Sequence, residues 1–132
     1  MLNDSRGQEQ AEAIMSLASA VATDEALEGT DYDGVSLVTY YSREKVVQYG
    51  FIYLSNGSIL EWVPSKDDSL EQSNLLRNLM SEPEDILQWD ACVIKISVIK
   101  NSVDCDFYYG SDANLWSTNP DHKEYLKSAA RP

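Results

Sequence analysis

Two pairs of aspartates have the clearest spacing for chemistry in this chain. Asp31 and Asp33 are separated by one residue. Asp104 and Asp106 repeat this spacing, so each pair directs both carboxylates to one side of an extended segment. Such a pair can meet an Arg-rich partner, bind a divalent cation, or form a solvated face, and the sequence leaves all three open. We predict partner contacts, with no metal and no cofactor.

The chain offers little for acid–base or covalent catalysis. Its one histidine, His122, lies between Asp121 and Lys123 in an expected first helical turn, where a solvated imidazole is the common case. Cys92 and Cys105 both fall within apolar alternation, and neither has a positioned base. Hydrolysis by two carboxylates needs proximity in space rather than in the chain, so it stays open. We predict that the protein is not an enzyme.

The charge of the chain points to the kind of partner. Twenty-two Asp and Glu against ten Lys and Arg give a formal net charge of -12 over 132 residues. A negative field of this size speeds encounter with a basic protein and repels nucleic acid. Phosphate contacts also demand a basic patch, which the sequence lacks. We predict a cationic protein partner and no direct binding of nucleic acid.

Location follows from what the sequence does not contain. The N-terminus has no basic start followed by an apolar segment, and no run approaches the roughly 18 apolar residues of a membrane span. We expect a cytoplasmic protein without a membrane partner, and favour a monomer. Cys92 and Cys105 lie on expected neighbouring strands, where a bridge is geometrically allowed, but buried free thiols are commoner in a reduced compartment.

The elements that position these residues follow from changes in the apolar period. A period of three to four predicts helices, a period of two predicts strands, and an acidic connection covers residues 23–33. Helices are expected over 8–22, 69–80 and after Pro120, and strands over 35–41, 46–54, 58–63, 90–99 and 103–109. The order α-β-β-β-α-β-β-α predicts one α+β domain over residues 1–132. It has an antiparallel sheet of about five strands, with helices mainly on one face.

The turn after the second strand predicts a register. Residues 55–58 read Ser-Asn-Gly-Ser, and Asn-Gly favours a two-residue type I′ hairpin. That turn pairs Tyr53 with Leu60 and Phe51 with Trp62. We expect these four side chains to share the core face of the sheet.

The other face of the sheet is expected to stay open for a partner. The residues Asp104, Asp106 and Tyr108 alternate with buried ones and point to that face. Trp116, in a polar stretch, is expected to be exposed, whereas Trp62 and Trp89 are expected in the core. The predicted partner-binding residues are Asp31, Asp33, Tyr40, Glu82, Glu84, Asp85, Asp104, Asp106, Tyr108, Asp112 and Trp116.

Several segments resemble those of a known protein group. They are Gln88-Trp89-Asp90, Val93-Ile94-Lys95-Ile96, Asp106-Phe107-Tyr108-Tyr109 and Trp116 before a terminal helix. Over approximately residues 35–127 this pattern resembles the YezG-like immunity proteins of bacterial polymorphic and contact-dependent toxin systems, and the terminal segment 127–132 departs from it. The resemblance implies a cytoplasmic one-domain antitoxin that blocks the toxic C-terminal domain of a partner, often a nuclease.

Three functions of different class follow. The first is an immunity protein that neutralises a cognate toxin domain, a basic nuclease, by covering its active cleft or substrate-entry surface. The second is an acidic adaptor or regulatory subunit that uses the open sheet face or an edge strand. The third is a small hydrolase with a carboxylate pair.

Overall fold

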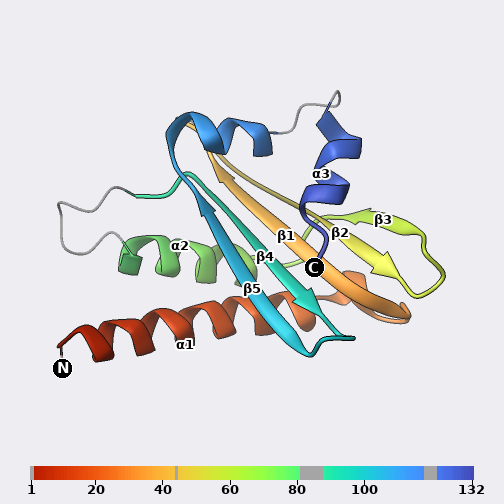
Figure 1. Cartoon of the computed structure of the whole chain (residues 1–132), viewed down its shortest axis with the longest axis horizontal. Helices are drawn as coiled ribbons and strands as arrows, with labels where there is room; N and C mark the ends of the chain where they lie inside the picture. The colour runs from red at the N-terminus through yellow and green to blue at the C-terminus, as the bar shows by residue number, and fades with distance from the viewer. Residues whose placement is uncertain (1, 44, 81–87, 118–121) are drawn as a thin grey trace.

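Helices and strands follow one another in the order that the sequence predicts (Figure 1). This computed structural model describes residues 2–43, 45–80, 88–117 and 122–132, with side chains from residue 7 onward. The helices are α1 (Leu2–Ala22), α2 (Asp68–Met80) and α3 (Lys123–Ala129), with 3₁₀-helices η1 (Glu25–Leu27) and η2 (Gly110–Trp116). The strands are β1 (Tyr32–Tyr41), β2 (Val46–Leu54), β3 (Ile59–Trp62), β4 (Ala91–Ser97) and β5 (Ser102–Tyr108). The predicted α+β fold class is confirmed.

The strands form one antiparallel sheet in the order β3-β2-β1-β4-β5. β1 lies at its centre, and its residues 34–39 are all buried. Such a continuous buried run is typical of a strand that is covered on both faces. β4 ends at Ser97, earlier than predicted, and Val98 in the following turn is 53% exposed rather than buried.

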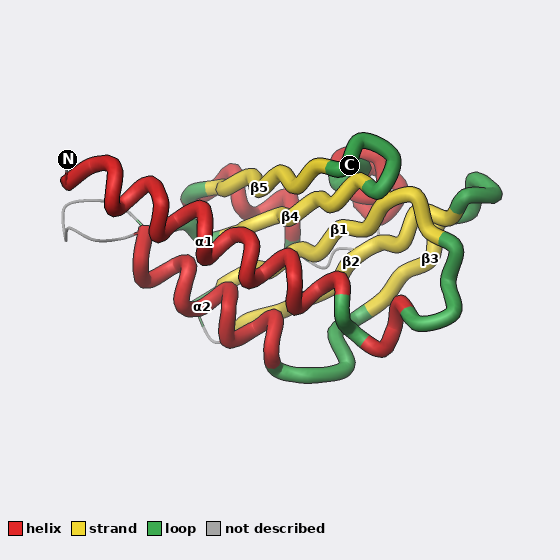
Figure 2. The backbone as a smooth tube through the Cα atoms, turned by 90° about the horizontal axis from the view of Figure 1, so that it is seen from below, coloured by secondary structure: helices red, strands yellow, loops and turns green. Residues whose placement is uncertain are grey.

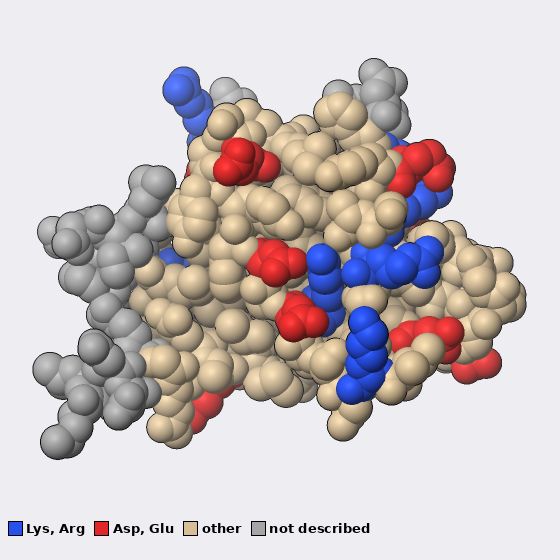
Figure 3. Space-filling model, viewed as in Figure 1, with Lys and Arg blue, Asp and Glu red and all other residues tan. Residues whose placement is uncertain are grey.

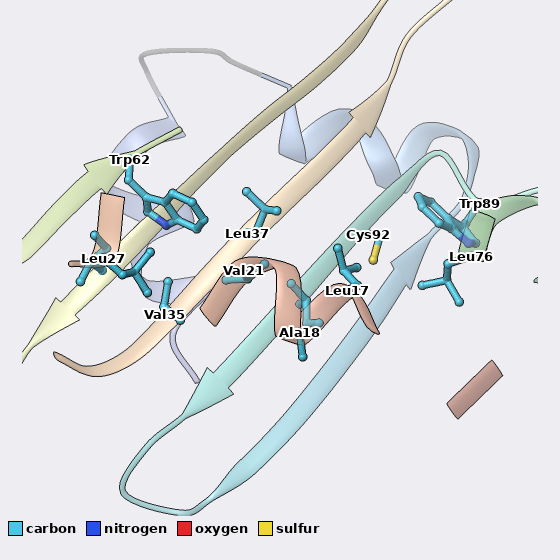
Figure 4. Close-up of a cluster of buried hydrophobic side chains, with 12 residues drawn as sticks. Leu17, Ala18, Val21, Leu27, Val35, Leu37, Trp62, Leu76, Trp89 and Cys92 are labelled. Carbon is cyan, nitrogen blue, oxygen red and sulfur yellow. The ribbon is translucent and has the colours of Figure 1, made fainter. Parts of the chain in front are cut away.

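A first core lies between the sheet and the pair α1 and α2, which pack side by side on one face (Figure 2). α1 contributes Leu17 and Val21, four residues apart and therefore on one side of the helix. α2 contributes Leu76, and the sheet side contributes Trp62 and Trp89 (Figure 4). Burying an apolar side chain of this size stabilises the fold by about 1.5–3 kcal/mol. The predicted core positions of both tryptophans are confirmed.

A chain of polar side chains lies between α2 and the sheet. Thr39 Oγ1 on β1 is 3.1 Å from Ser73 Oγ, and it accepts a hydrogen bond from Gln48 Nε2 at 3.0 Å. Ser69 Oγ donates to Gln48 Oε1 at 3.3 Å. Thr39, Ser69 and Ser73 are buried, so a hydroxyl left without its partner would cost about 1–3 kcal/mol. Hydrogen bonds as well as apolar contacts therefore hold α2 in place.

A second, smaller core covers part of the face that the sequence predicts to be open. η2 and α3 lie there, with Trp116 and Leu126 packed against Val38, Phe51 and Val93 of the sheet. Figure 1 shows both elements across the sheet from α1 and α2. The physical reason is that Phe51 and Val93 make this face too apolar to remain in water.

The β2–β3 hairpin differs from its predicted register by one residue. Tyr53 pairs with Ile59, and Leu54 N–H donates to the Ser58 carbonyl at 2.8 Å. The loop therefore has three residues rather than two, and its last residue, Gly57, has φ 90°. That is the three-residue loop in which a left-handed glycine follows a turn.

The shift separates the side chains that were predicted to share a face. Phe51 and Tyr53 point into the second core, and Trp62 points into the first. A slip of one residue exchanges the two faces of a strand, so the predicted face for Phe51 and Trp62 together was wrong.

Two tyrosines of β2 fasten the second layer to the sheet. Tyr49 Oη donates to the Trp116 carbonyl at 2.7 Å, and Tyr53 Oη donates to the Lys127 carbonyl at 2.6 Å. Burial raises the pKa of both phenols above the usual value of 10.0, so they remain protonated donors at neutral pH.

We expect the free energy of unfolding to fall as the pH rises above about 10. The unfolded chain then loses phenolic protons that folded Tyr49 and Tyr53 retain, so it binds fewer protons and becomes favoured. The contribution of these two phenols to the free energy of unfolding is fully present below the usual tyrosine pKa. It is lost as the pH rises from that value through the raised pKa values of the folded state. Urea unfolding across the alkaline range measures the loss. Tyr49→Phe should reduce the slope, Tyr109→Phe serves as an exposed control, and a flat wild-type profile would contradict the prediction.

Candidate protein-binding surface

The carboxylates of β5 point to the same face of the sheet as η2 and α3. Cys105 between them packs into the first core, so Asp104 and Asp106 lie on the opposite side, as predicted. Asp104 is exposed and pairs across the ladder with Lys95. Asp106 is half-buried, and its Oδ2 lies 3.1 Å from Lys95 Nζ. One of the two carboxylates is therefore held in an ion pair within the molecule.

Basic side chains lie among the acidic ones on this face. Figure 3 shows Lys and Arg beside Asp and Glu over the sheet, so the visible surface is mixed rather than uniformly acidic. The ion pair of Lys95 with Asp106 is one cause, and Arg131 is another, with its guanidinium 4.9 Å from the ring centroid of Tyr53. A partner that approaches here meets Asp104 as a free carboxylate and Asp106 as a paired one.

Tyr40 and Tyr108 lie in one row across three strands. Tyr40 pairs with Ala91 on β4, and Ala91 pairs with Tyr108 on β5. Tyr40 Oη donates to Asn114 Oδ1 at 3.2 Å, so its hydroxyl contacts η2. Both rings are half-buried, which leaves only their outer parts for a partner. Burial, and then the negative charge of Asp106, raise the pKa of Tyr108.

The prediction that Trp116 is exposed was wrong. Its side chain is 1% exposed, and its ring centroid lies 5.3 Å from that of Tyr108. η2 turns back over the sheet after Gly110, which has φ 56°, and the small Ala91 belongs to the same core as the indole. Trp116 is therefore a core residue and does not contact a partner directly.

Two exposed tyrosines were missed by the sequence interpretation. Tyr109 is 40% exposed directly after β5, and Tyr125 on α3 is 60% exposed. The sequence predicts that both Tyr125 and Leu126 dock α3, but of these two only Leu126, which is 3% exposed, packs into the second core, together with Ala129 and Ala130. The signal for Tyr125 is the period of a short helix, in which adjacent residues 125 and 126 cannot both face the sheet.

Asp31 and Asp33 lie at the other end of the sheet. Asp33 Oδ1 accepts a hydrogen bond from Ser55 Oγ at 2.8 Å, whereas Asp31 is exposed. Asp33 and Tyr40 are seven residues apart along β1, which is about 23 Å at the rise of a strand. The predicted residues therefore fall in two separate places and do not form one site.

The remaining predicted contacts have different outcomes. Asp112 lies in the first turn of η2 and is exposed. It is therefore on the side of the sheet on which Tyr108 and Trp116 pack. Glu82, Glu84 and Asp85 lie outside the described residues. His122 is exposed before α3, which agrees with the solvated imidazole that the sequence predicts.

The two described hollows differ in their acidic side chains. A hollow of about 340 Å³ is lined by Gly29, Thr30, Asp31, Leu54, Asn56 and Leu60, of which only Asp31 is acidic. A second, of about 230 Å³, includes Asp24 and Glu28. Both oxygens of Asp24 already accept hydrogen bonds, from Ala26 N, Ser65 N and Ser65 Oγ. In the described residues, no three His, Cys, Asp or Glu are grouped to hold a metal ion.

Comparison with known proteins does not identify the function of this surface. Within the described part of the chain, no helix is both long and apolar enough to cross a membrane. No protein-family model matches the sequence, and no curated protein matches it.

Proposed function

We propose that this chain is a cytoplasmic immunity protein that binds and neutralises a cationic toxin domain, a nuclease. The resemblance over residues 35–127 supplies the class, and the distribution of charge supports it independently. A nuclease needs a basic cleft for phosphates, so an inhibitor gains by placing carboxylates where nucleic acid would lie.

The observation that carries the proposal is that positive charges are engaged within the molecule while many carboxylates are not. Among the described residues, five basic side chains form ion pairs, namely Lys66, Arg77, Lys95, Lys123 and Lys127. Arg77 also stacks on Tyr41, 4.2 Å from the ring centroid. The net charge of -12 is therefore carried by carboxylates such as Asp104 and Asp112, which have no ion pair among the described residues.

The outer side of η2, α3 and β5 is the surface that we assign to the toxin. It combines exposed Asp104 and Asp112 with the exposed aromatic side chain of Tyr125. Charge of this kind accelerates association, and tyrosine anchors slow dissociation because their large rings are desolvated in the complex. Tyr108 contributes the exposed part of its ring between these groups.

Neutralising Asp104 and Asp112 together should slow association with the toxin by roughly tenfold at low salt. The variant is Asp104→Asn with Asp112→Asn, and the partner is the toxin domain encoded beside this gene. Association and dissociation rates are measured across a salt series. We expect a weaker salt dependence of association and little change in dissociation, because the field guides encounter and the rings hold the complex.

The matched control removes the same charge from the opposite side. Glu9→Gln with Glu71→Gln changes two exposed carboxylates on α1 and α2. An equal slowing by both double variants would mean that net charge matters and this surface does not. Failure of the wild-type protein to bind the toxin, or to rescue growth when the two are expressed together, would contradict the immunity function itself.

An adaptor function has one structural observation in its favour. β5 is at the edge of the sheet, and β2 also continues past β3, which pairs only with residues 50–53. Unpaired backbone groups on an edge can accept a strand from another protein. Stable copurification with a housekeeping complex, in cells that lack the toxin gene, would favour this function over immunity.

A further inference from the structure

Two thiols face each other inside the first core. Cys92 on β4 and Cys105 on β5 have their Sγ atoms 3.2 Å apart, and both are free cysteines. In the ladder, Cys92 pairs with Phe107 and Ile94 pairs with Cys105, so the two cysteines are diagonal neighbours on one face. Cys92 lies among the buried side chains of Figure 4. This proximity is a property of the fold, since the two cysteines are thirteen positions apart in the chain.

The two thiols differ in their access to solvent. Cys92 is 1% exposed, whereas Cys105 is only partly buried. A hydrogen bond with Cys105 and then burial raise the pKa of Cys92, so its thiol stays protonated at neutral pH. The thiolate is the reactive form of a cysteine. Because Cys105 is the more accessible of the two, it is the thiol that an external reagent meets first, and Cys92 then reacts with it.

We propose that Cys92 and Cys105 form a reversible disulfide when the protein meets a small-molecule disulfide of the glutathione class. The Cys105 thiolate attacks one sulfur of the reagent, the reagent's S–S bond breaks, and one small thiolate leaves. Cys92 then releases its proton to water, its sulfur attacks Cys105 Sγ, and the second small thiolate leaves. Two protein thiols and one small disulfide become one protein disulfide and two small thiols, so electrons and atoms balance.

Forming the bond requires only a small movement of the two sulfur atoms. A disulfide needs its sulfur atoms about 2.05 Å apart, so they must approach by roughly 1 Å inside a packed core. The bond ties β5, an edge strand, to β4, which lies inside the sheet. The inference depends only on the two thiols and is independent of the proposed immunity function.

Oxidised glutathione at graded ratios to reduced glutathione tests the proposal on the folded protein. After quenching with an alkylating reagent, the intact mass should show a loss of about two mass units, one for each thiol hydrogen, with neither cysteine alkylated. Dithiothreitol should restore two alkylatable thiols. Far-ultraviolet circular dichroism on the same samples shows that the protein stays folded.

Single variants separate the roles of the two cysteines. Cys92→Ala should trap glutathione on Cys105 as a stable mixed disulfide, and Cys105→Ser should leave Cys92 unmodified while the protein is folded. The wild-type chain in urea is the control that the reagent can join these cysteines. If the urea-treated chain closes and the folded one keeps two free thiols, or closes only as its circular dichroism is lost, the proposal is overturned.

Discussion

Replacing Gly50 by Ala is expected to lower the free energy of unfolding by at least about 3 kcal/mol. A Cβ atom there would lie 2.1 Å from the Ser36 carbonyl oxygen and 2.5 Å from Trp62 Nε1. Trp62 pairs with Gly50 in the ladder, and its Nε1 donates to that same carbonyl at 3.1 Å. The oxygen belongs to the backbone of the central strand, so relief would require β1 itself to move. Urea unfolding curves of the two proteins measure the difference.

Gly7 provides a matched control for this substitution. It lies in α1, and a Cβ atom there would meet nothing within 4 Å. Gly7→Ala should therefore stabilise the protein by up to about 1 kcal/mol, because alanine loses less backbone entropy in a helix. A loss below about 1 kcal/mol for Gly50→Ala would mean that Trp62 does not pack on the sheet as described.

Truncating Trp116 to Ala is expected to cost about 3–5 kcal/mol, the range for a large aromatic side chain removed from a core. The indole packs on Tyr108, so its loss loosens η2 from the sheet, whereas the backbone carbonyl of residue 116 can still accept the hydrogen bond from Tyr49. Thermal and urea unfolding measure the cost.

Tyr125 gives the opposite outcome if it is a partner contact. Tyr125→Ala removes a ring that is 60% exposed, so stability should change by less than about 0.5 kcal/mol. Dissociation from the toxin should become faster by roughly tenfold, as at an interface hot spot. If Trp116→Ala were as stable as the wild type, the indole would not be part of the core, and Trp116 would again be a predicted partner contact.

Local patterns predict the elements of this fold well. The period of two in 35–41 and 46–54, and the period of three to four in 8–22 and 69–80, arise from burial on one side and are visible residue by residue. Element order then follows, and short turns make the neighbours antiparallel. The β2–β3 register could not be obtained in this way, because Asn56-Gly57 serves both a two-residue and a three-residue loop.

The candidate surface was less accessible to sequence reasoning because it depends on contacts between distant segments. The polar neighbours of Trp116 favoured exposure, but the chain turns at Gly110 and packs η2 on the second face. The pairing of Lys95 with Asp106 was within reach, since Asp106 was predicted to point outward and Lys95 lies on the adjacent strand of the same predicted hairpin. Tyr125 was predicted as a docking residue because the sequence does not say which side of a short helix meets the sheet.

The hydrogen-bonded side chains between α2 and the sheet determine the position of this helix more than they increase the stability of its packing. Thr39, Gln48, Ser69 and Ser73 satisfy one another only when the helix has one rotation and one axial position, since a displacement of one residue would leave buried hydroxyls unpaired. An all-aliphatic seam would tolerate several such placements with similar energy. These hydrogen bonds therefore favour a single arrangement of α2 on the sheet. They also fix where the exposed carboxylates and amides of α2 lie on the surface.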